Sequence, residues 1–234
     1  MVILALDTTA AAGSAAIVRD GALAIERDGD GSRTHGERLP RELMAILSDA
    51  GLTLADVDGF AVVTGPGSFT GLRVGIAAIQ GLALARQKLV APVTAFEALA
   101  SVAGPPSTLI GAWIDAHRGE VFASLYAPDG QTVIEPPTSL QPEATLDAWV
   151  RRPLDAGARI QFVGDGAVRY ADLIRARLGE RAGMPARAPG LAGRAGLIAA
   201  ADWARAVTPH ALVPLYVRRS YVELAREARE AAKP

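Results

Sequence analysis

Cysteine is absent from this 234-residue sequence, so the chain has no disulfide, no thiolate nucleophile and no cysteine-containing zinc or iron–sulfur site. No stretch approaches the roughly 20 consecutive apolar residues of a membrane-spanning helix. Basic residues are not in excess either, because the chain has 24 Lys and Arg and 25 Asp and Glu. The chain therefore has no global basic field of the kind that gives nucleic-acid-binding proteins most of their non-specific affinity.

Half of the residues are hydrophobic and 21% are charged, which is typical of a globular protein. A chain of this length buries roughly 70% of its unfolded surface, enough for one large domain or two lobes. Met1 leads directly into an apolar run with no basic region or cleavage site, so no secretion signal is predicted. We expect a cytoplasmic protein without a membrane partner.

The first half of the chain alternates strand and helix signals. Asp20-Gly21 between two apolar runs predicts a hairpin, and Leu39, Leu43 and Ile46 have the three- and four-residue spacing of an amphipathic helix. The predicted strands are 2–6, 13–18, 22–26, 57–64 and 90–93, and the predicted helices are 35–50, 70–86 and 95–103. Three strands followed by alternating helices and strands predict a mixed sheet with helices on its faces.

The second half partly repeats this order after the Pro-rich linker 104–107. The predicted strands are 109–114, 120–126, 132–134, 159–163 and 213–217, and the predicted helices are 143–150, 167–178, 191–206 and 223–233. We therefore predict an α/β, two-lobed fold of the actin-like and ribonuclease H-like kind, with lobes at 1–104 and 105–234. Whether the last helix packs back on the first lobe stays open.

The most distinctive motif is Gly65-Pro66-Gly67-Ser68-Phe69-Thr70-Gly71-Leu72-Arg73-Val74-Gly75, between a predicted strand and a predicted helix. Two interpretations stay open: the glycines and the helix N-terminus bind an anion, or they form a tight turn with Ser68 or Thr70 as N-cap. It is neither a P-loop nor a dinucleotide-binding fingerprint, because the required Gly-Lys-Ser/Thr and glycine spacings are missing.

The predicted helix after this motif carries a stripe of small and apolar residues, namely Gly71, Gly75, Ala78, Leu82 and Ala85. Small residues at these spacings let another helix approach closer than the usual 8 to 10 Å or so between axes. That helix belongs either to this chain or to a partner, and the pattern alone does not decide between them.

Several motifs in order along the chain resemble the TsaB family, also called YeaZ. They are 2–9 (VILALDTT), 35–40 (HGERLP), 65–75, 115–122 (DAHRGEVF), 164–167 (GDGA) and 214–218 (PLYVR). The resemblance implies a non-catalytic scaffold for TsaD, the similar subunit that transfers threonylcarbamoyl to tRNA. It implies TsaD and TsaE as partners, tRNA bound only through the complex, and a homodimer when the chain is alone.

The same resemblance places a partner interface on the helices after His35 and Thr70. Its expected residues are His35, Glu37, Leu39, Leu43, Gly71, Gly75, Ala78 and Leu82. We expect no cofactor to be required by this subunit, with ATP or ADP and magnesium at the junction of the complex. The alternatives are an actin-like ATP-dependent kinase and a glycoprotease-like enzyme of the peptidase M22 type.

TsaD-like chemistry uses a metal held by two histidines four residues apart, and here His35 is followed at the second position by Leu39. We therefore predict no metal site and no catalytic residue. Asp7 ends the first predicted strand, where actin-like kinases orient magnesium, but a turn-capping role beside Thr9 is the alternative. The candidate vestigial nucleotide or anion site comprises Asp7, Thr8, Thr9, Gly65, Gly67, Ser68 and Thr70.

Two further groups of residues have open interpretations. Asp115 and Glu120 flank a predicted hairpin turn, either as a carboxylate pair or as part of a solvated turn. Gly164-Asp165-Gly166 occupies the position of an adenosine-binding turn in actin-like folds. His117 and His210 are distant in sequence, and without an H-E-x-x-H motif they do not predict a hydrolytic zinc centre.

Overall fold

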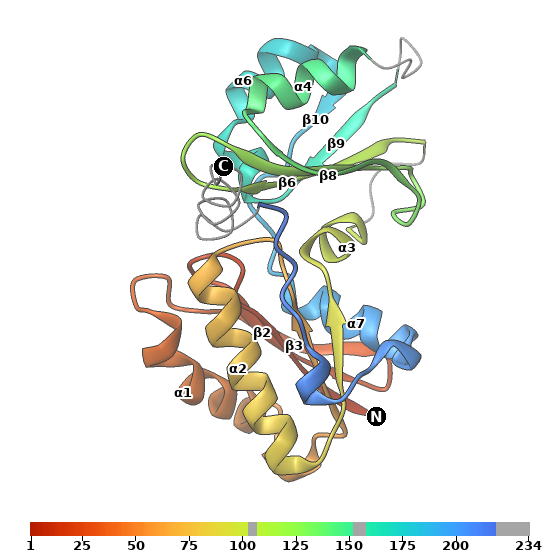
Figure 1. Cartoon of the computed structure of the whole chain (residues 1–234). Coiled ribbons are helices and arrows are strands. Elements are labelled where there is room, and N and C mark those ends of the chain that lie inside the picture. Colours follow the sequence, from red (N-terminus) through yellow and green to blue (C-terminus); the bar gives the residue numbers. More distant parts are fainter. Residues whose placement is uncertain (103–106, 152–157, 219–234) are drawn as a thin grey trace, which may run out of the picture.

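The computed structural model describes residues 1–102, 107–151 and 158–218. They form two five-stranded mixed sheets, one in each half of the chain (Figure 1). The first has the order β3-β2-β1-β4-β5, with β1 (Val2–Asp7), β2 (Ser14–Arg19), β3 (Ala22–Asp28), β4 (Gly59–Val63) and β5 (Val90–Val93). β1 to β3 form an antiparallel meander, and β4 and β5 extend it in parallel.

The second sheet repeats this topology, which confirms the predicted mixed-sheet α/β fold. Its order is β10-β9-β6-β7-β8, with β6 (Leu109–Asp115), β7 (Val121–Tyr126), β8 (Val133–Leu140), β9 (Ile160–Val163) and β10 (Ala182–Gly183). β6 therefore corresponds to β1, and β9 corresponds to β4. The loop after β9 occupies the place in its sheet that the loop after β4 occupies in the first.

Two helices cover one face of the first sheet, α1 (His35–Asp49) and α2 (Phe69–Arg86), and they lie side by side in Figure 1. Their inward residues form the first core with Leu4, Leu6 and Ile17. The second sheet is covered by α4 (Pro142–Arg151), α5 (Asp165–Arg169) and α6 (Ala171–Leu178), which pack on a core centred on Trp113 and Phe162.

Each of the two remaining helices packs on the sheet of the other half of the chain. α3 (Ala95–Ala100) follows β5 of the first sheet but packs on β6 of the second, where Phe96 and Leu99 join Ile114 in one core cluster. α7 (Ala192–Ala201) comes from the second half but packs on β1, β2 and β4. Each half therefore supplies a helix that completes the core of the other.

Several predicted elements differ from the structure. Residues 213–217 form no strand, and Val213 is 72% exposed. The free edge of β5 is occupied by Val207, which exchanges two backbone hydrogen bonds with Val90. Predicted helix 167–178 is broken at Tyr170 into α5 and α6.

Predicted helix 191–206 ends at Ala201, and Trp203–Arg205 forms a 3-10 turn whose Trp203 ring packs against Gly59. β8 continues to Leu140, beyond the predicted end at 134, because its two prolines lie on an edge strand that tolerates missing amide donors.

Most of the predicted linker and the whole of predicted helix 223–233 lie outside the described residues. Within the described part of the chain, no helix is long and apolar enough to cross a membrane.

Candidate functional site

The loop after β1 and the loop before α2, both predicted as a vestigial nucleotide or anion site, pack directly on each other. The Ser68 amide donates to the Thr9 carbonyl oxygen at 2.8 Å, and Gly67 leaves no room for a side chain against Thr9. Ser68 Oγ accepts from the Gly71 amide at 3.2 Å, so Ser68 is the N-cap of α2, whereas Thr70 is exposed. The structure thus favours the tight-turn interpretation of this motif.

Asp7 has the turn-capping arrangement that the sequence left as one of two interpretations. Its Oδ1 accepts from the Thr9 amide at 2.8 Å and from Thr9 Oγ1 at 2.7 Å. The side chain is buried, and burial raises the pKa of Asp7 to about 6, with smaller contributions from Asp165 and Glu26. The cavity between Asp7 and Asp165 measures about 40 Å³. That volume is large enough for ordered water, whereas ligand sites usually measure hundreds of Å³.

The small-residue stripe of α2 packs inside this chain. A side chain at Gly75 would overlap the Thr8 hydroxyl, and one at Gly71 would overlap the Thr8 carbonyl oxygen. Ala78 and Leu82 lie partly buried against the first core. Gly71 and Gly75, expected at a partner interface, therefore bring α2 close to the end of β1 in the same chain.

Leu39 and Leu43 were also expected at the partner interface, and both are only 2% exposed in the first core. Both belong to the apolar face of the amphipathic helix α1, and this face packs against the sheet. Glu37 remains at the surface, where its carboxylate accepts from the amide and the hydroxyl of Thr34 and completes a capping box.

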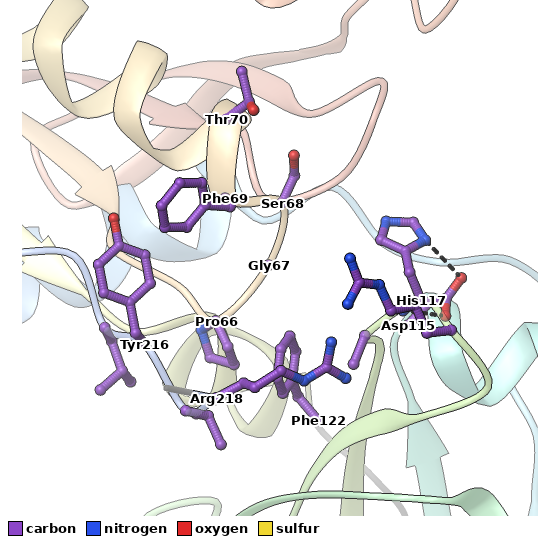
Figure 2. Close-up of a pocket in the computed structure, with 14 residues that line it drawn as sticks. Pro66, Gly67, Ser68, Phe69, Thr70, Asp115, His117, Phe122, Tyr216 and Arg218 are labelled. Atoms are coloured by element: carbon purple, nitrogen blue, oxygen red, sulfur yellow. Dashed lines mark hydrogen bonds and ion pairs between the residues drawn. The ribbon is translucent and has the colours of Figure 1, made fainter. Parts of the chain in front are cut away.

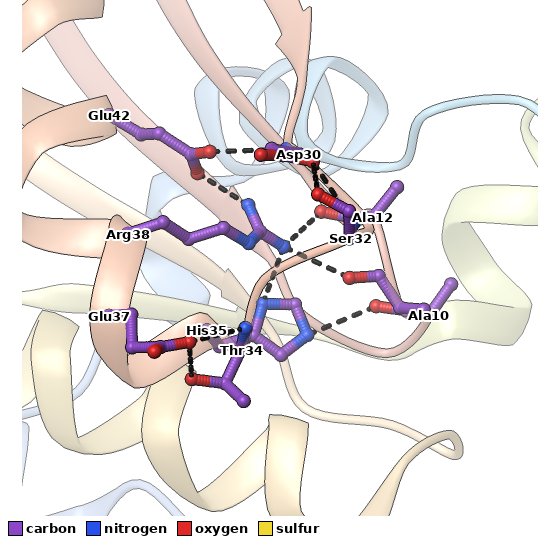
Figure 3. Close-up of polar contacts among 10 residues, drawn as sticks. Ala10, Ala12, Asp30, Ser32, Thr34, His35, Glu37, Arg38 and Glu42 are labelled. Carbon is purple, nitrogen blue, oxygen red and sulfur yellow. Dashed lines mark hydrogen bonds and ion pairs between the residues drawn. The ribbon is translucent and has the colours of Figure 1, made fainter.

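His35 lies at the start of α1 in a network that fixes the loop after β1 (Figure 3). Its Nε2 is 3.1 Å from the Ala10 carbonyl oxygen, and its Nδ1 is 2.8 Å from an Arg38 guanidinium nitrogen. These partners require a neutral ring that donates from Nε2 and accepts at Nδ1. Burial, with the Arg38 charge second, lowers the pKa of His35 in agreement with the neutral form.

Arg38 is the buried centre of this network, although an arginine on a predicted amphipathic helix would ordinarily be assigned to the solvated face. Its guanidinium donates to the carbonyl oxygens of Ala11, at 3.1 Å, and Ala12, and to the Glu42 carboxylate at 2.5 Å. Figure 3 shows these bonds joining α1 to the loop. This role was not predictable from the sequence, because the loop carbonyl groups that Arg38 contacts lie 26 and 27 positions before it.

A cavity of about 470 Å³ lies between the two halves of the chain (Figure 2). We call it the interlobe pocket. It is lined by 66–70, which lead into the first turn of α2, by 115–118 and Phe122 of the β6–β7 hairpin, and by 215–218. These segments belong to three of the motifs that carry the family resemblance. Sequence reasoning did not place them together, and their shared occurrence in that resemblance was the available signal.

Two aromatic rings form part of one wall of the interlobe pocket, and a guanidinium group packs beside them. The rings of Phe69 and Tyr216 have centroids 5.2 Å apart, and the Arg73 guanidinium lies 3.7 Å from the Phe69 centroid. Arg73 Nε also donates to the Tyr216 hydroxyl at 3.2 Å. Both rings are about two-fifths exposed, so this wall of the pocket is accessible.

The opposite wall is the turn of the β6–β7 hairpin, in which His117, Arg118 and Gly119 all have positive φ. The Glu120 amide donates to the His117 carbonyl oxygen at 3.1 Å, which closes the turn. Non-glycine residues in this backbone region are strained. Asp115 offsets part of that strain, because its Oδ1 accepts from the His117 amide at 3.0 Å.

Asp115 and Glu120 have separate partners in the structure, so they do not act as a proton-sharing carboxylate pair. Asp115 Oδ2 is 3.5 Å from an Arg169 guanidinium nitrogen. Glu120 accepts from Ser139 Oγ at 2.8 Å and pairs with Arg218, and these bonds hold the pKa of Glu120 below its usual value.

Asp165 supports the hairpin from behind, because its Oδ1 accepts from the Asp115 amide at 3.0 Å and from the Gly166 amide at 2.8 Å. Gly164-Asp165-Gly166 thus braces the end of β6. In the first half, the loop before α2 braces the end of β1 in the corresponding place.

Comparisons with known proteins identify the relatives of this chain. Residues 29–151, about half of the chain, match the family described as "TsaD: tRNA N6-adenosine threonylcarbamoyltransferase". The chain is 37% identical to the tRNA threonylcarbamoyladenosine biosynthesis protein TsaB of Escherichia coli over 131 residues, which cover 55% of this chain and 56% of that protein. It is 26% identical to TsaB of Bacillus subtilis over 225 residues, which cover 95% and 96% of the two chains.

The solved structure of YeaZ from Pseudomonas aeruginosa is 31% identical in sequence and superposes with a TM-score of 0.74. The match covers 92% of this chain and 99% of that one. It spans both sheets and the helices on them, and it confirms the two-lobed actin-like fold. The chain therefore belongs to the TsaB (YeaZ) family.

Proposed function

We propose that this chain takes part in the synthesis of threonylcarbamoyladenosine in tRNA as a non-catalytic subunit that pairs with TsaD. The observation that carries the proposal is the state of His35 and Leu39. The resemblance to TsaD calls for two metal-binding histidines at these positions. Here one position has a histidine with both ring nitrogens already bonded, and the other has a leucine buried in the core.

The surface proposed for TsaD is the outer side of α1 and α2. Outward along α2 run Ala77, Gly81 and Leu84, which form an apolar strip with Leu84 46% exposed. On α1, Met44 is 43% exposed. We call these four residues the outer strip. In this strip the small residues Ala77 and Gly81 allow close approach of a partner helix, and Leu84 and Met44 offer it apolar surface; the buried Gly75 is unavailable for such a contact.

In this proposal the subunit requires no cofactor of its own. TsaE joins the same complex, and ATP or ADP with magnesium binds at the junction of the subunits. The other subunits hold most of the tRNA, which agrees with the formal net charge of −1 on this chain.

A reconstituted transfer reaction tests the proposal. TsaC, TsaD, TsaE, ATP, threonine, bicarbonate and unmodified tRNA are combined with and without this chain. We expect modified tRNA only when this chain is present, and none when TsaD is omitted. Equal product without this chain would contradict the scaffold role, and phosphate release from ATP by the isolated chain would favour the kinase alternative.

The outer strip is tested with a matched pair of substitutions. Leu84→Glu places a charge on the strip, whereas Leu89→Glu makes the same change at a leucine of similar exposure, 42%, in the loop after α2. We expect Leu84→Glu to weaken TsaD binding by about tenfold or more, since burying an unpaired carboxylate costs well over the 1.4 kcal/mol that this corresponds to. Leu89→Glu should bind as the unchanged chain does, and equal affinity of the two variants would exclude the strip.

The same strip offers a surface for a second copy of this chain, because one exposed patch can pair with itself around a two-fold axis. We expect weak concentration-dependent dimers in sedimentation experiments without TsaD, and monomers for Leu84→Glu. A monomeric profile for the unchanged chain at high concentration would remove self-association from the proposal.

A further inference from the structure

The interlobe pocket concentrates positive charge in a chain whose overall charge is slightly negative. The pocket lining includes the guanidinium groups of Arg118 and Arg218 and the Asp115 carboxylate, whereas Arg73, Arg169 and Glu120 lie beside it, each in contact with a lining residue. Each carboxylate is engaged by one of these arginines. Among the described residues, Arg73 and Arg118 have no such ion pair, so two positive charges remain for a ligand.

Flat groups are stacked beside these charges. The Arg73 guanidinium, the Phe69 ring and the Tyr216 ring follow one another, and Figure 2 shows the two rings on the wall formed by the start of α2 and the 215–218 segment. Tyr216 is 40% exposed. A nucleobase stacks favourably on aromatic rings and on guanidinium planes whatever its sequence.

We infer that the interlobe pocket binds one nucleotide of a single-stranded RNA segment, with its base against Tyr216 and a phosphate near Arg118. The inference rests on the proposed function, in which the chain works on tRNA. The cavity of about 470 Å³ is within the range of nucleotide-sized ligand sites. Flat stacking groups next to unpaired guanidinium groups favour a nucleotide over a peptide segment.

The spread of the arginines favours RNA over a free nucleotide. Arg73 lies on the α2 side of the pocket, whereas Arg118 and Arg169 lie on the hairpin side. Arginines on both sides of the pocket can contact successive phosphates of an RNA strand, whereas a single phosphate group would need only one arginine. Because the walls come from both halves of the protein, bound RNA contacts both.

The test measures binding of a fluorescent single-stranded RNA oligonucleotide to the full chain by anisotropy at low salt. Arg118→Gln removes an unpaired charge from an exposed turn, and Tyr216→Leu removes the stacking ring. Arg175→Gln is the control, because it makes the same change at an exposed arginine of α6 outside the pocket.

We expect Tyr216→Leu to weaken RNA binding by about tenfold, the size of one base stack. Arg118→Gln should weaken binding and lower the slope of log affinity against log salt by about 0.7, the value for one phosphate contact on a single strand. Arg175→Gln should change the affinity less than Arg118→Gln does. Thermal unfolding of each variant shows whether it is folded. If Tyr216→Leu is not folded, the inference is judged from the binding of Arg118→Gln alone.

Three outcomes would overturn the inference. They are no RNA binding by the unchanged chain, equal losses for Arg118→Gln and Arg175→Gln, and displacement of the RNA by an acidic peptide but not by unlabelled RNA. Adenosine monophosphate that binds as tightly as the oligonucleotide would assign the pocket to a free nucleotide instead. If RNA binding fails while the reconstituted transfer still requires this chain, only the inference is lost; if both fail, so is the proposed function.

Discussion

At the scale of single residues, Asp7 is a buried carboxyl group at the end of β1 that accepts hydrogen bonds from the amide and the hydroxyl of Thr9. Burial disfavours the charged form, so its pKa rises from an ordinary value near 4 to about 6. In the folded chain the proton is held more tightly than in the unfolded chain. The contribution of Asp7 to stability therefore falls as pH rises from about 4 to about 6, and stays at its lower value above that.

Asp7→Asn should remove the loss of stability caused by ionisation of Asp7, while the amide oxygen of Asn can still accept a hydrogen bond from Thr9. We expect the free energy of unfolding near pH 7.5 to rise by about 1–2 kcal/mol, below the roughly 3 kcal/mol set by the pKa shift because the added NH₂ also needs a partner. Urea unfolding of both proteins at about pH 4.5 and about pH 7.5 measures it. A difference between variant and unchanged chain that is the same at both pH values would contradict the assigned pKa.

Local sequence signals predicted some of these residues and not others. The Thr9 contact of Asp7 and the N-cap of Ser68 were both among the interpretations, because each involves residues two or three positions apart. The burial of Arg38 was not predictable, because its partners in the loop after β1 come near only when the sheet forms. The interlobe pocket has the same origin, since three distant segments build it.

At the scale of elements, α2 shows why a small-residue pattern predicts close packing but not its direction. Gly71 and Gly75 face inward against Thr8, whereas Ala77 and Gly81 face outward. The sequence pattern predicted the bounds of the helix to within one residue. Because small residues occur on both sides, it did not show which side faces the core and which faces solvent. The apolar run at 213–217 was wrongly predicted as a strand, because apolar residues also occur in an irregular segment such as this one, in which the Leu215 amide donates to the Thr64 carbonyl oxygen.

The two glycines give a matched test on one helix. Gly75→Ala adds a methyl group that overlaps the Thr8 side chain, whereas at Gly81 nothing lies within 4 Å of the added atom. We expect Gly75→Ala to lower the free energy of unfolding by about 1–3 kcal/mol through overpacking. Gly81→Ala should raise it by about 0.5–1 kcal/mol, since alanine loses less backbone entropy in a helix.

Urea midpoints measured under identical conditions give both values. If the two variants shifted the midpoint in the same direction, the assigned inner and outer sides of α2 would be incorrect. Binding of Gly81→Ala to TsaD then reports separately on the outer strip, because this change leaves the core untouched.

At the scale of the whole molecule, the exchange of α3 and α7 makes each half depend on the other. The face of the first sheet that α7 covers carries side chains that are fully buried in the intact chain, namely Ile3, Ala5, Ala16, Val18 and Ala61. The sequence predicted two similar sets of elements and a linker between them. It could not show that the helix after each last strand packs on the opposite sheet, because both helices are short and apolar.

A fragment of residues 1–104 should therefore fail to fold alone, although it contains every strand of the first sheet. The uncovered face would expose a contiguous apolar surface of the kind that leads to aggregation. We expect poor dispersion in its amide NMR spectrum and binding of a hydrophobic dye, with both reversed when residues 105–234 are produced with it. A well-dispersed spectrum of the fragment alone would show that α7 is dispensable.

The position of α7 near the end of the chain also sets an order of events during synthesis. The last strand of the first sheet, β5, ends at Val93, but α7 ends at Ala201. A ribosome that adds about 5–20 residues per second needs on the order of ten seconds to make the intervening segment. For that interval the apolar side chains that α7 later covers remain exposed in the nascent chain, and a chaperone that shields nascent chains would find its binding surface there.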